Sequence, residues 1–266
     1  MSEAVVDLNA DLGEGYGPYT LGADADMLPI VSSASIACGL HAGDPVIMRR
    51  TVRRALQHDT AVGAHVGYPD LWGFGRRPVQ LSKDELHCFL LYQLGSLEGF
   101  LRAEGASMQH VKPHGILYNE AARDESLSTL ICDVIHSFDA ELILFAPAGS
   151  ITADVARQKG LRVAEEGFAD RGYTPQGTLV PRGQMGAVIE DVRQVSERAA
   201  ELARGQVLSS DGSLLELKID TICLHGDTPN AAGFARAIRA ELDAAEIEVR
   251  PVSTFLKESS SGRRHS

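Results

Sequence analysis

Four side chains that can bind cations or move protons stand close together near the start of the chain: Asp7, Asn9, Asp11 and Glu14. The apolar residues between them predict a buried strand that Gly13 ends. Because side chains alternate along a strand, Asp7, Asn9 and Asp11 share one side of it. Acidic groups that face the same way repel one another unless a cation, a substrate or water lies beside them. The segment is therefore a candidate site, the plainer alternative being a strand that leads into an Asp-rich loop.

Four histidines each follow a different apolar segment, and each stands within two residues of a glycine: His41, His65, His114 and His225. The glycines allow sharp turns and a close approach of the backbone to a ligand. One histidine at a strand end is usually an ordinary loop residue, but four in equivalent positions predict a shared site. Their imidazoles suit proton transfer, substrate binding or metal binding.

Basic side chains occur in the same segments. Lys112 can stabilise an oxyanion or a phosphate, and Arg76, Arg77 and Arg171 can hold a carboxylate or phosphate through two hydrogen bonds. The Gly-Phe-Gly-Arg-Arg segment lacks the spacing of either glycine-rich phosphate-binding motif, and it is also compatible with a basic surface loop. Asp44 stands before a proline and predicts a helix N-cap, whatever else it binds.

Short apolar segments alternate with helical patterns, and these elements must position the polar residues. Strands are expected near residues 4–9, 32–37, 61–66, 108–112, 141–146, 161–165 and 219–224. Helices are expected after Asp44, after the capping box Ser82–Glu85, and over residues 186–204 and 229–244. The alternation predicts a parallel sheet covered by helices. Periodicity alone fits an open or a closed sheet, but polar residues after so many strands favour a barrel.

The composition narrows the class of protein. The chain has 266 residues, of which 44% are hydrophobic and 23% charged, as in a soluble globular protein. Its net charge of −11 disfavours binding to nucleic acid or to anionic membranes. No apolar stretch approaches the roughly 20 residues that span a bilayer, and no export signal is visible.

The cysteines indicate the cellular compartment, and the composition along the chain indicates the domain boundaries. Cys38, Cys88, Cys132 and Cys223 are far apart and form no Cys-x-x-Cys pair, which predicts reduced thiols in a cytoplasmic protein. No linker divides the chain, so we expect one domain over residues 1–256. The polar residues 257–266 are expected to form a flexible tail.

Seven long motifs resemble the LamB/YcsF family, and they occur in the family's order over nearly the whole chain. They are DLNADLGE at 7–14, ACGLHAGDP at 37–45, GAHVGYPD at 63–70, GFGRRP at 73–78, VKPHGILYN at 111–119, EGFADRGYTPQGTLVPR at 166–182 and CLHGD at 223–227. The resemblance implies a seven-stranded (β/α) barrel similar to the glycoside hydrolase/deacetylase barrels. It also implies the role of the A subunit of a 5-oxoprolinase, which opens the lactam of 5-oxoproline to L-glutamate with ATP hydrolysis and with partner subunits B and C.

The resemblance also suggests a divalent metal, either Mg²⁺ bound together with ATP or an ion bound by the protein. Related deacetylase barrels bind a divalent ion through one Asp and two His, which correspond here to Asp11, His65 and His114. The alternative is that these side chains bind the substrate directly. The chain contains no P-loop, so ATP must be contacted by another arrangement or partly by the partner subunits.

The candidate residues fall into two groups. The catalytic candidates are Asp11, His41, His65, Lys112, His114 and His225. The substrate-binding candidates are Asn9, Glu14, Asp44, Arg76, Arg77, Arg171 and Asp227. Within the first group, either Asp11 or His65 can serve as general base toward water.

Two other functions remain open at this point. One is a stand-alone metal-dependent deacetylase or amidohydrolase acting on a sugar or small amide. The other is a non-catalytic binding or scaffolding component, which the density of proton-transfer residues disfavours. The chain also departs from the family pattern at three positions. Ser35 replaces an Asn near a strand end, whereas Leu40 replaces a Phe and Val66 a Pro, two changes expected to affect packing.

Overall fold

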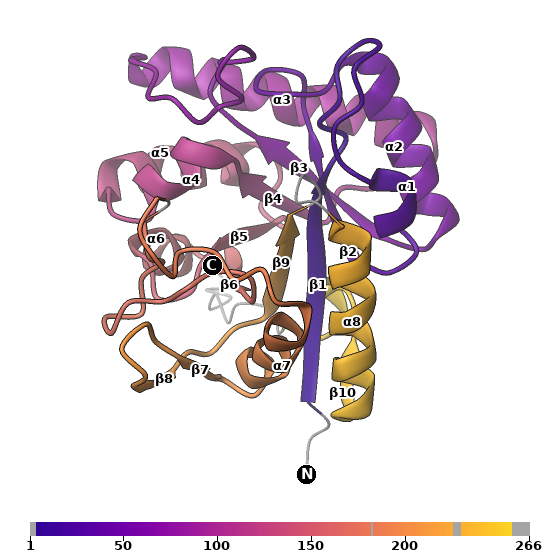
Figure 1. Ribbon diagram of the computed structural model, residues 1–266. Coiled ribbons are helices and arrows are strands. Elements are labelled where there is room, and N and C mark those ends of the chain that lie inside the picture. The colour runs from indigo at the N-terminus through magenta and orange to yellow at the C-terminus, as the bar shows by residue number, and fades with distance from the viewer. Residues whose placement is uncertain (1–3, 182, 226–229, 257–266) are drawn as a thin grey trace, which may run out of the picture.

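Seven parallel strands close into a barrel in the computed structural model, which describes residues 4–181, 183–225 and 230–256 (Figure 1). The barrel strands are β1 (Ala4–Leu12), β2 (Ser33–Ala37), β3 (Ala61–Val66), β4 (His110–Pro113), β5 (Ile143–Pro147), β6 (Arg162–Phe168) and β9 (Thr221–His225). Each strand pairs with the next, and β9 pairs with both β6 and β1, which closes the barrel. The predicted fold is confirmed, and every predicted strand is present within a few residues.

The register brings the candidate residues to one end of the barrel. Asp11 on β1 is level with His225 on β9, and His65 on β3 is level with Lys112 on β4. In Figure 1, β1 in indigo runs beside β9, although the two strands are far apart in sequence. Because all these strands are parallel, their carboxyl ends meet at the same mouth.

Helices surround the barrel and bury their apolar faces against it. They are α1 (Asp24–Met27), α2 (Pro45–Gln57), α3 (Lys83–Ala103), α4 (Gly115–Ala121), α5 (Glu125–Phe138), α6 (Ile151–Gln158), α7 (Val192–Ala203) and α8 (Ala231–Ala244), with a 3-10 turn, η1, at Val252–Thr254. On α3, for example, Leu90, Leu94 and Leu97 are fully buried, as their spacing predicts. In the part of the chain that the structure describes, no helix has the length and apolar character needed to cross a bilayer.

The predicted helix starts are confirmed at two places and corrected at a third. Asp44 caps α2 by accepting hydrogen bonds from the backbone of Val46 and Ile47, and Ser82 and Glu85 form the capping box of α3. The helix predicted from residue 186 begins only at Val192, because the Asp191 side chain caps it there.

Three short strands and the helices α1, α4, α5 and α6 were not predicted. The strands β7 (Gln206–Leu208) and β8 (Leu214–Glu216) form a small antiparallel hairpin after α7. The strand β10 (Ile247–Val249) pairs with the start of β1 outside the closed barrel. The predicted tail, residues 257–266, lies outside the described residues.

Candidate functional site

A cavity of about 220 Å³ opens at the carboxyl ends of the barrel strands. The candidate residues that line it are Asp11, Glu14, His65, Arg76, Lys112, His114 and Arg171. Pro113, Gly115, Ile116, Tyr118, Asn119, Phe168 and Leu179 complete the wall. The cavity therefore combines carboxylates, imidazoles and cations with one apolar side.

Lys112 lies at the bottom of this cavity and connects four strands. Its Nζ donates to Asp11 Oδ1 at 2.9 Å, to Asn9 Oδ1 at 3.2 Å and to Cys223 Sγ at 3.0 Å, and it lies 2.9 Å from Glu166 Oε1. Burial by itself would lower the pKa of Lys112, but Asp11, Cys223 and Glu166 together raise this pKa well above its ordinary value. The side chain is therefore a fixed ammonium at the cavity floor.

Glu166 is the second carboxylate on this ammonium, and it was not among the site residues predicted from the sequence. Besides the ion pair with Lys112, it accepts hydrogen bonds from Asn9 Nδ2 at 2.9 Å and from the Tyr118 hydroxyl at 2.5 Å. Burial and the nearby Glu166 carboxylate raise the pKa of Tyr118 well above its ordinary value, so the hydroxyl keeps its proton. The available signal for this group was a glutamate directly after the predicted strand at 161–165.

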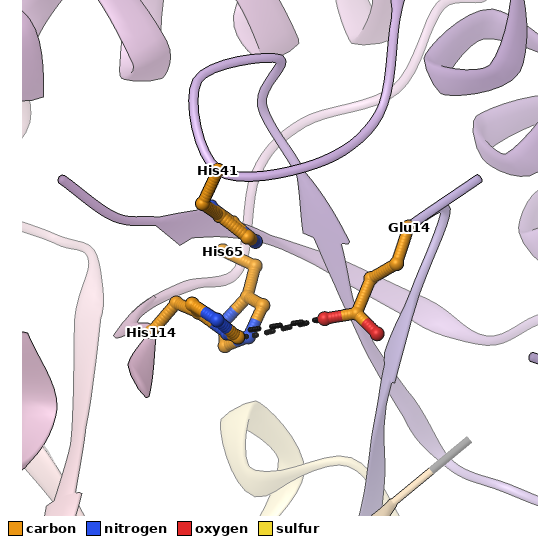
Figure 2. Close-up of side chains that lie close together, drawn as sticks. All are labelled: Glu14, His41, His65 and His114. Carbon is orange, nitrogen blue, oxygen red and sulfur yellow. Dashed lines mark hydrogen bonds and ion pairs between the residues drawn. The ribbon is translucent and has the colours of Figure 1, made fainter. Parts of the chain in front are cut away.

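Three histidines and Glu14 form a cluster at the edge of the same cavity (Figure 2). His65 Nε2 and His114 Nδ1 are 2.9 Å apart, and Glu14 Oε1 lies 4.0 Å from the first and 3.8 Å from the second. The ring of His41 is stacked on that of His114, with centroids 3.9 Å apart. The four residues offer ligand atoms within 4.8 Å of one another, so they form a group able to hold a metal ion.

One tight turn, at Phe74 and Gly75, holds these imidazoles in place. An added Cβ at Gly75, whose φ is +63°, would lie 2.8 Å from His114 Cδ2 and 2.9 Å from His41 Cβ, so only glycine fits there. The neighbouring Phe74 has a φ of +56°, a strained value for an aromatic residue, and its carbonyl oxygen lies 2.7 Å from His114 Nε2. The strained turn thus orients the His114 ring.

The remaining candidates are distributed around the cavity or away from it. Arg171 is buried and donates to the carbonyls of Val180 and Ala187, and Arg76 lies over the ring of Phe74 at 4.9 Å. Arg77, by contrast, forms an ion pair with Asp70 and does not line the cavity.

Three further candidates contribute no described side chain to the cavity. The Asp44 carboxylate accepts hydrogen bonds from the backbone N–H groups at the N-terminus of α2 and from that of Gly17. The side chain of His225 and all of Asp227 lie outside the described residues.

A second polar group lies deeper in the barrel, toward the amino ends of the strands. Asp7 accepts hydrogen bonds from Ser32 at 2.7 Å, Ser33 at 2.6 Å and Thr221 at 2.5 Å. Burial raises the pKa of Asp7 to about 6, although the three hydroxyls oppose this shift. Thr221 in turn accepts from Asn9 at 2.7 Å, which links this group to the cavity floor.

One of the three positions at which this chain departs from the family pattern, Ser35, lies below the cavity. Ser35 is fully buried, and its Oγ lies 3.0 Å from His110 Nε2. Gln109 Nε2 lies 3.2 Å from the other ring nitrogen, and the His110 ring is stacked on Phe145. The polar contact of Ser35 is therefore with His110, below the cavity. Val66 lies in the apolar core, as expected, and Leu40 is half-buried.

A closed (β/α) barrel with a charged cavity at the carboxyl ends of its strands is the arrangement of barrel enzymes. The sequence model of the LamB/YcsF family matches residues 6–257. The chain therefore belongs to the LamB/YcsF family.

Relatives and solved structures agree with this assignment. The 5-oxoprolinase A subunit of Pyrococcus furiosus is 48% identical over 253 residues, which cover 95% of this chain and 99% of that protein. The protein of the same name from Methylococcus capsulatus is 49% identical over 252 residues, 94% of this chain and 97% of that one. The crystal structure of the lactam utilization protein from Thermus thermophilus matches with a TM-score of 0.89 and 44% identity, covering 92% of this chain and 99% of that one.

Proposed function

We propose that this protein is the A subunit of an ATP-dependent 5-oxoprolinase, a hydrolase that opens the lactam of 5-oxoproline to L-glutamate. The relatives that carry the name of this 5-oxoprolinase subunit match over nearly their full length, and they support this role over that of a stand-alone deacetylase. The observation that carries the proposal is the fixed ammonium of Lys112 beside Asp11 and His65 at the floor of a small polar cavity.

The proposal includes partners, a co-substrate and a location. The word "subunit" in the relatives' names supports partner proteins, which we assign as subunits B and C. ATP is the proposed co-substrate, and phosphorylation of the lactam oxygen would make the ring carbon a better electrophile. We place the protein in the cytoplasm, in keeping with the free thiols that Cys38, Cys88, Cys132 and Cys223 form in the described part of the chain.

Opening of the phosphorylated ring requires water to add to the ring carbon and the C–N bond to break, with a proton reaching the leaving nitrogen. The acyl phosphate formed in this way then has to lose phosphate to a second water to give L-glutamate. Asp11 Oδ2 lies at the cavity wall, 3.4 Å from His65 Nε2, and is positioned to take the proton from water. Lys112 stabilises negative charge on the lactam oxygen as it is phosphorylated and on the attached phosphate. Arg76 and Arg171 are the wall cations suited to the substrate carboxylate or a phosphate. A divalent ion at the histidine cluster would polarise the carbonyl or bound water.

The decisive experiment is glutamate release from 5-oxoproline by the purified chain, with and without ATP and with and without the two partner subunits. We expect glutamate only when ATP and both partners are present. Asp11→Asn should then lower the rate by about 10²–10⁴-fold, as expected for loss of a proton acceptor. Asp154→Asn, on the exposed face of α6, is the matched control.

Two outcomes would contradict the proposal. Release without ATP or partners would favour a stand-alone amidohydrolase. Full activity of an Asp11→Asn/His65→Ala double variant would favour a non-catalytic component.

A further inference from the structure

The contact between His65 and His114 poses a hydrogen-bonding problem. The other nitrogen of each ring lies beside a backbone carbonyl: His65 Nδ1 is 3.1 Å from the carbonyl oxygen of Lys112, and His114 Nε2 is 2.7 Å from that of Phe74. A carbonyl can only accept, so each of these outer nitrogens carries the hydrogen of a neutral imidazole. The inner nitrogens, His65 Nε2 and His114 Nδ1, therefore present lone pairs to each other at 2.9 Å. Two lone pairs at this distance need a cation between or beside them.

The surroundings supply further donors for such a cation. His41 is fully buried, and neither of its ring nitrogens has a hydrogen-bond partner among the described residues. Buried polar atoms of this kind call for an explanation, such as a bound ion. The Glu14 carboxylate points at the inner nitrogens of His65 and His114 from the opposite side (Figure 2). Carbonyls that bind the outer nitrogens are also the usual second shell of metal-binding histidines.

We propose that Glu14, His41, His65 and His114 bind one divalent transition-metal ion at the mouth of the barrel. Two nitrogens about 2.0–2.1 Å from one ion lie roughly 2.9–3.4 Å apart, which includes the distance between the His65 and His114 nitrogens. Glu14 has to move inward by less than about 1 Å to join them. The His41 ring is parallel to that of His114, so it must rotate to turn a lone pair toward the ion.

The donor set indicates the kind of ion. Three imidazoles and one carboxylate suit zinc, cobalt, manganese or iron, whereas magnesium and calcium prefer sites made of oxygen atoms. The set also differs from Asp11, His65 and His114, the one implied by the resemblance. Asp11 Oδ1 is committed to Lys112 at 2.9 Å, whereas its Oδ2 is 3.4 Å from His65 Nε2. In this arrangement Asp11 takes part in proton transfer and does not bind the metal ion. The inference adds a cofactor site to the proposed function, and its geometric basis does not depend on that function.

The test is metal binding by the full chain without turnover. Chelator-treated protein is titrated separately with Zn²⁺, Co²⁺, Mn²⁺ and Mg²⁺ by calorimetry, and the Co²⁺ form is examined by absorption spectroscopy. We expect one equivalent of Zn²⁺ or Co²⁺ per chain, weak binding of Mg²⁺, and visible Co²⁺ bands. His65→Ala and His114→Ala should weaken binding by more than the roughly 10–100-fold typical of outer-shell changes. His58→Ala, at the exposed C-terminal end of α2, should not.

A pair of carboxylate variants distinguishes the two ligand sets. Glu14→Gln should weaken Zn²⁺ binding strongly, and Asp11→Asn should weaken it little. The reverse result would overturn the proposed set, and the absence of a stoichiometric ion in the wild type would overturn the site. Circular dichroism of each variant checks folding, and a Zn²⁺-dependent rise in the melting temperature of the wild type tests binding without any substitution. Because no measurement uses 5-oxoproline, failure here would leave the proposed ring opening standing.

Discussion

The two ends of the barrel interior contain similar residues in different states. Below the cavity, toward the amino end, Asp7, Ser35 and His110 are buried and their side-chain polar atoms have hydrogen-bond partners. At the carboxyl end, His65 and His114 direct lone pairs at each other beside a cavity, and His41 has no hydrogen-bond partner among the described residues. Burial of polar groups is thus common to both ends. Incomplete pairing beside an opening distinguishes the end at which we expect chemistry.

His110 and His114 illustrate this difference in hydrogen bonding. Burial lowers the pKa of each to about 3, so a shifted pKa does not separate them. Both nitrogens of His110 have side-chain partners, Ser35 and Gln109. The inner nitrogen of His114 instead faces His65. The partners of a buried histidine, more than its pKa, indicate whether it is structural or functional.

The largest effect should come from Lys112→Met, which removes the cation at the carboxyl end. Asp11 and Glu166 would then be buried without compensation, and the developing negative charge on the substrate would lose its nearest cation. We expect glutamate release to fall by at least about 10³-fold and the free energy of unfolding by about 3–5 kcal/mol. An assay with partners and ATP measures the first, and urea unfolding the second.

A surface ion pair provides the control for this variant. Lys159→Met removes the partner of Asp133 and should cost less than about 1 kcal/mol. If Lys112→Met kept activity within tenfold of the wild type, the carboxyl end would not depend on its cation.

Asp7→Asn, toward the amino end of the barrel, should change how the free energy of unfolding depends on pH. The folded pKa of Asp7 is about 6, above its ordinary value of 3.8. As the pH rises through this interval, the unfolded chain loses its proton first, so the free energy of unfolding of the wild type falls. Relative to the variant, the wild type should lose up to about 3 kcal/mol between about pH 4 and pH 7.

Urea unfolding at several pH values measures this difference. Asp26→Asn, at an exposed carboxyl on α1, should follow the wild type. Parallel pH profiles of Asp7→Asn and the wild type would show that the hydroxyls of Ser32, Ser33 and Thr221 compensate the buried charge completely.

The smallest effect should come from Ser35→Ala at the same end. The variant leaves His110 Nε2 without its partner in a fully buried position, which should cost about 1–3 kcal/mol of unfolding free energy. Glutamate release should stay within about twofold, because Ser35 does not line the cavity. Thermal melts and the coupled assay test the two statements. A large loss of activity with unchanged stability would place Ser35 in the functional end and weaken the distinction between the two regions.

Much of the fold could be predicted because its signals are local. Apolar runs marked all seven barrel strands, and the side chains of Asp44, Ser82 and Glu85 marked two helix starts. The short strands β7, β8 and β10 escaped prediction because three residues are too few to show a period. The start of α7 was misplaced because the cap at Asp191 outweighs the helical spacing before it.

The candidate site was only partly predictable. Arg76 and Arg77 are neighbours with the same chemistry, yet Arg76 lines the cavity and Arg77 binds Asp70. Glu14 was predicted to bind substrate and was not among the metal ligands that the resemblance implied. The structure, however, places it beside His65 and His114. The direction in which a loop side chain points depends on how the loop packs, and no short sequence motif encodes that packing.

The sequence by itself determined the seven barrel strands, the helices α2, α3, α7 and α8, the family and the polar residues that follow the strands, since each depends on neighbours along the chain. Only the tertiary structure decided which of these residues meet. Lys112 contacts Asn9, which is 103 residues away, and Cys223, which is 111 residues away. Such contacts exist because β9 closes the barrel between β6 and β1 in one register. Closure therefore brings Lys112, Asp11 and Glu166 together and gathers His41, His65 and His114 at the same mouth of the barrel.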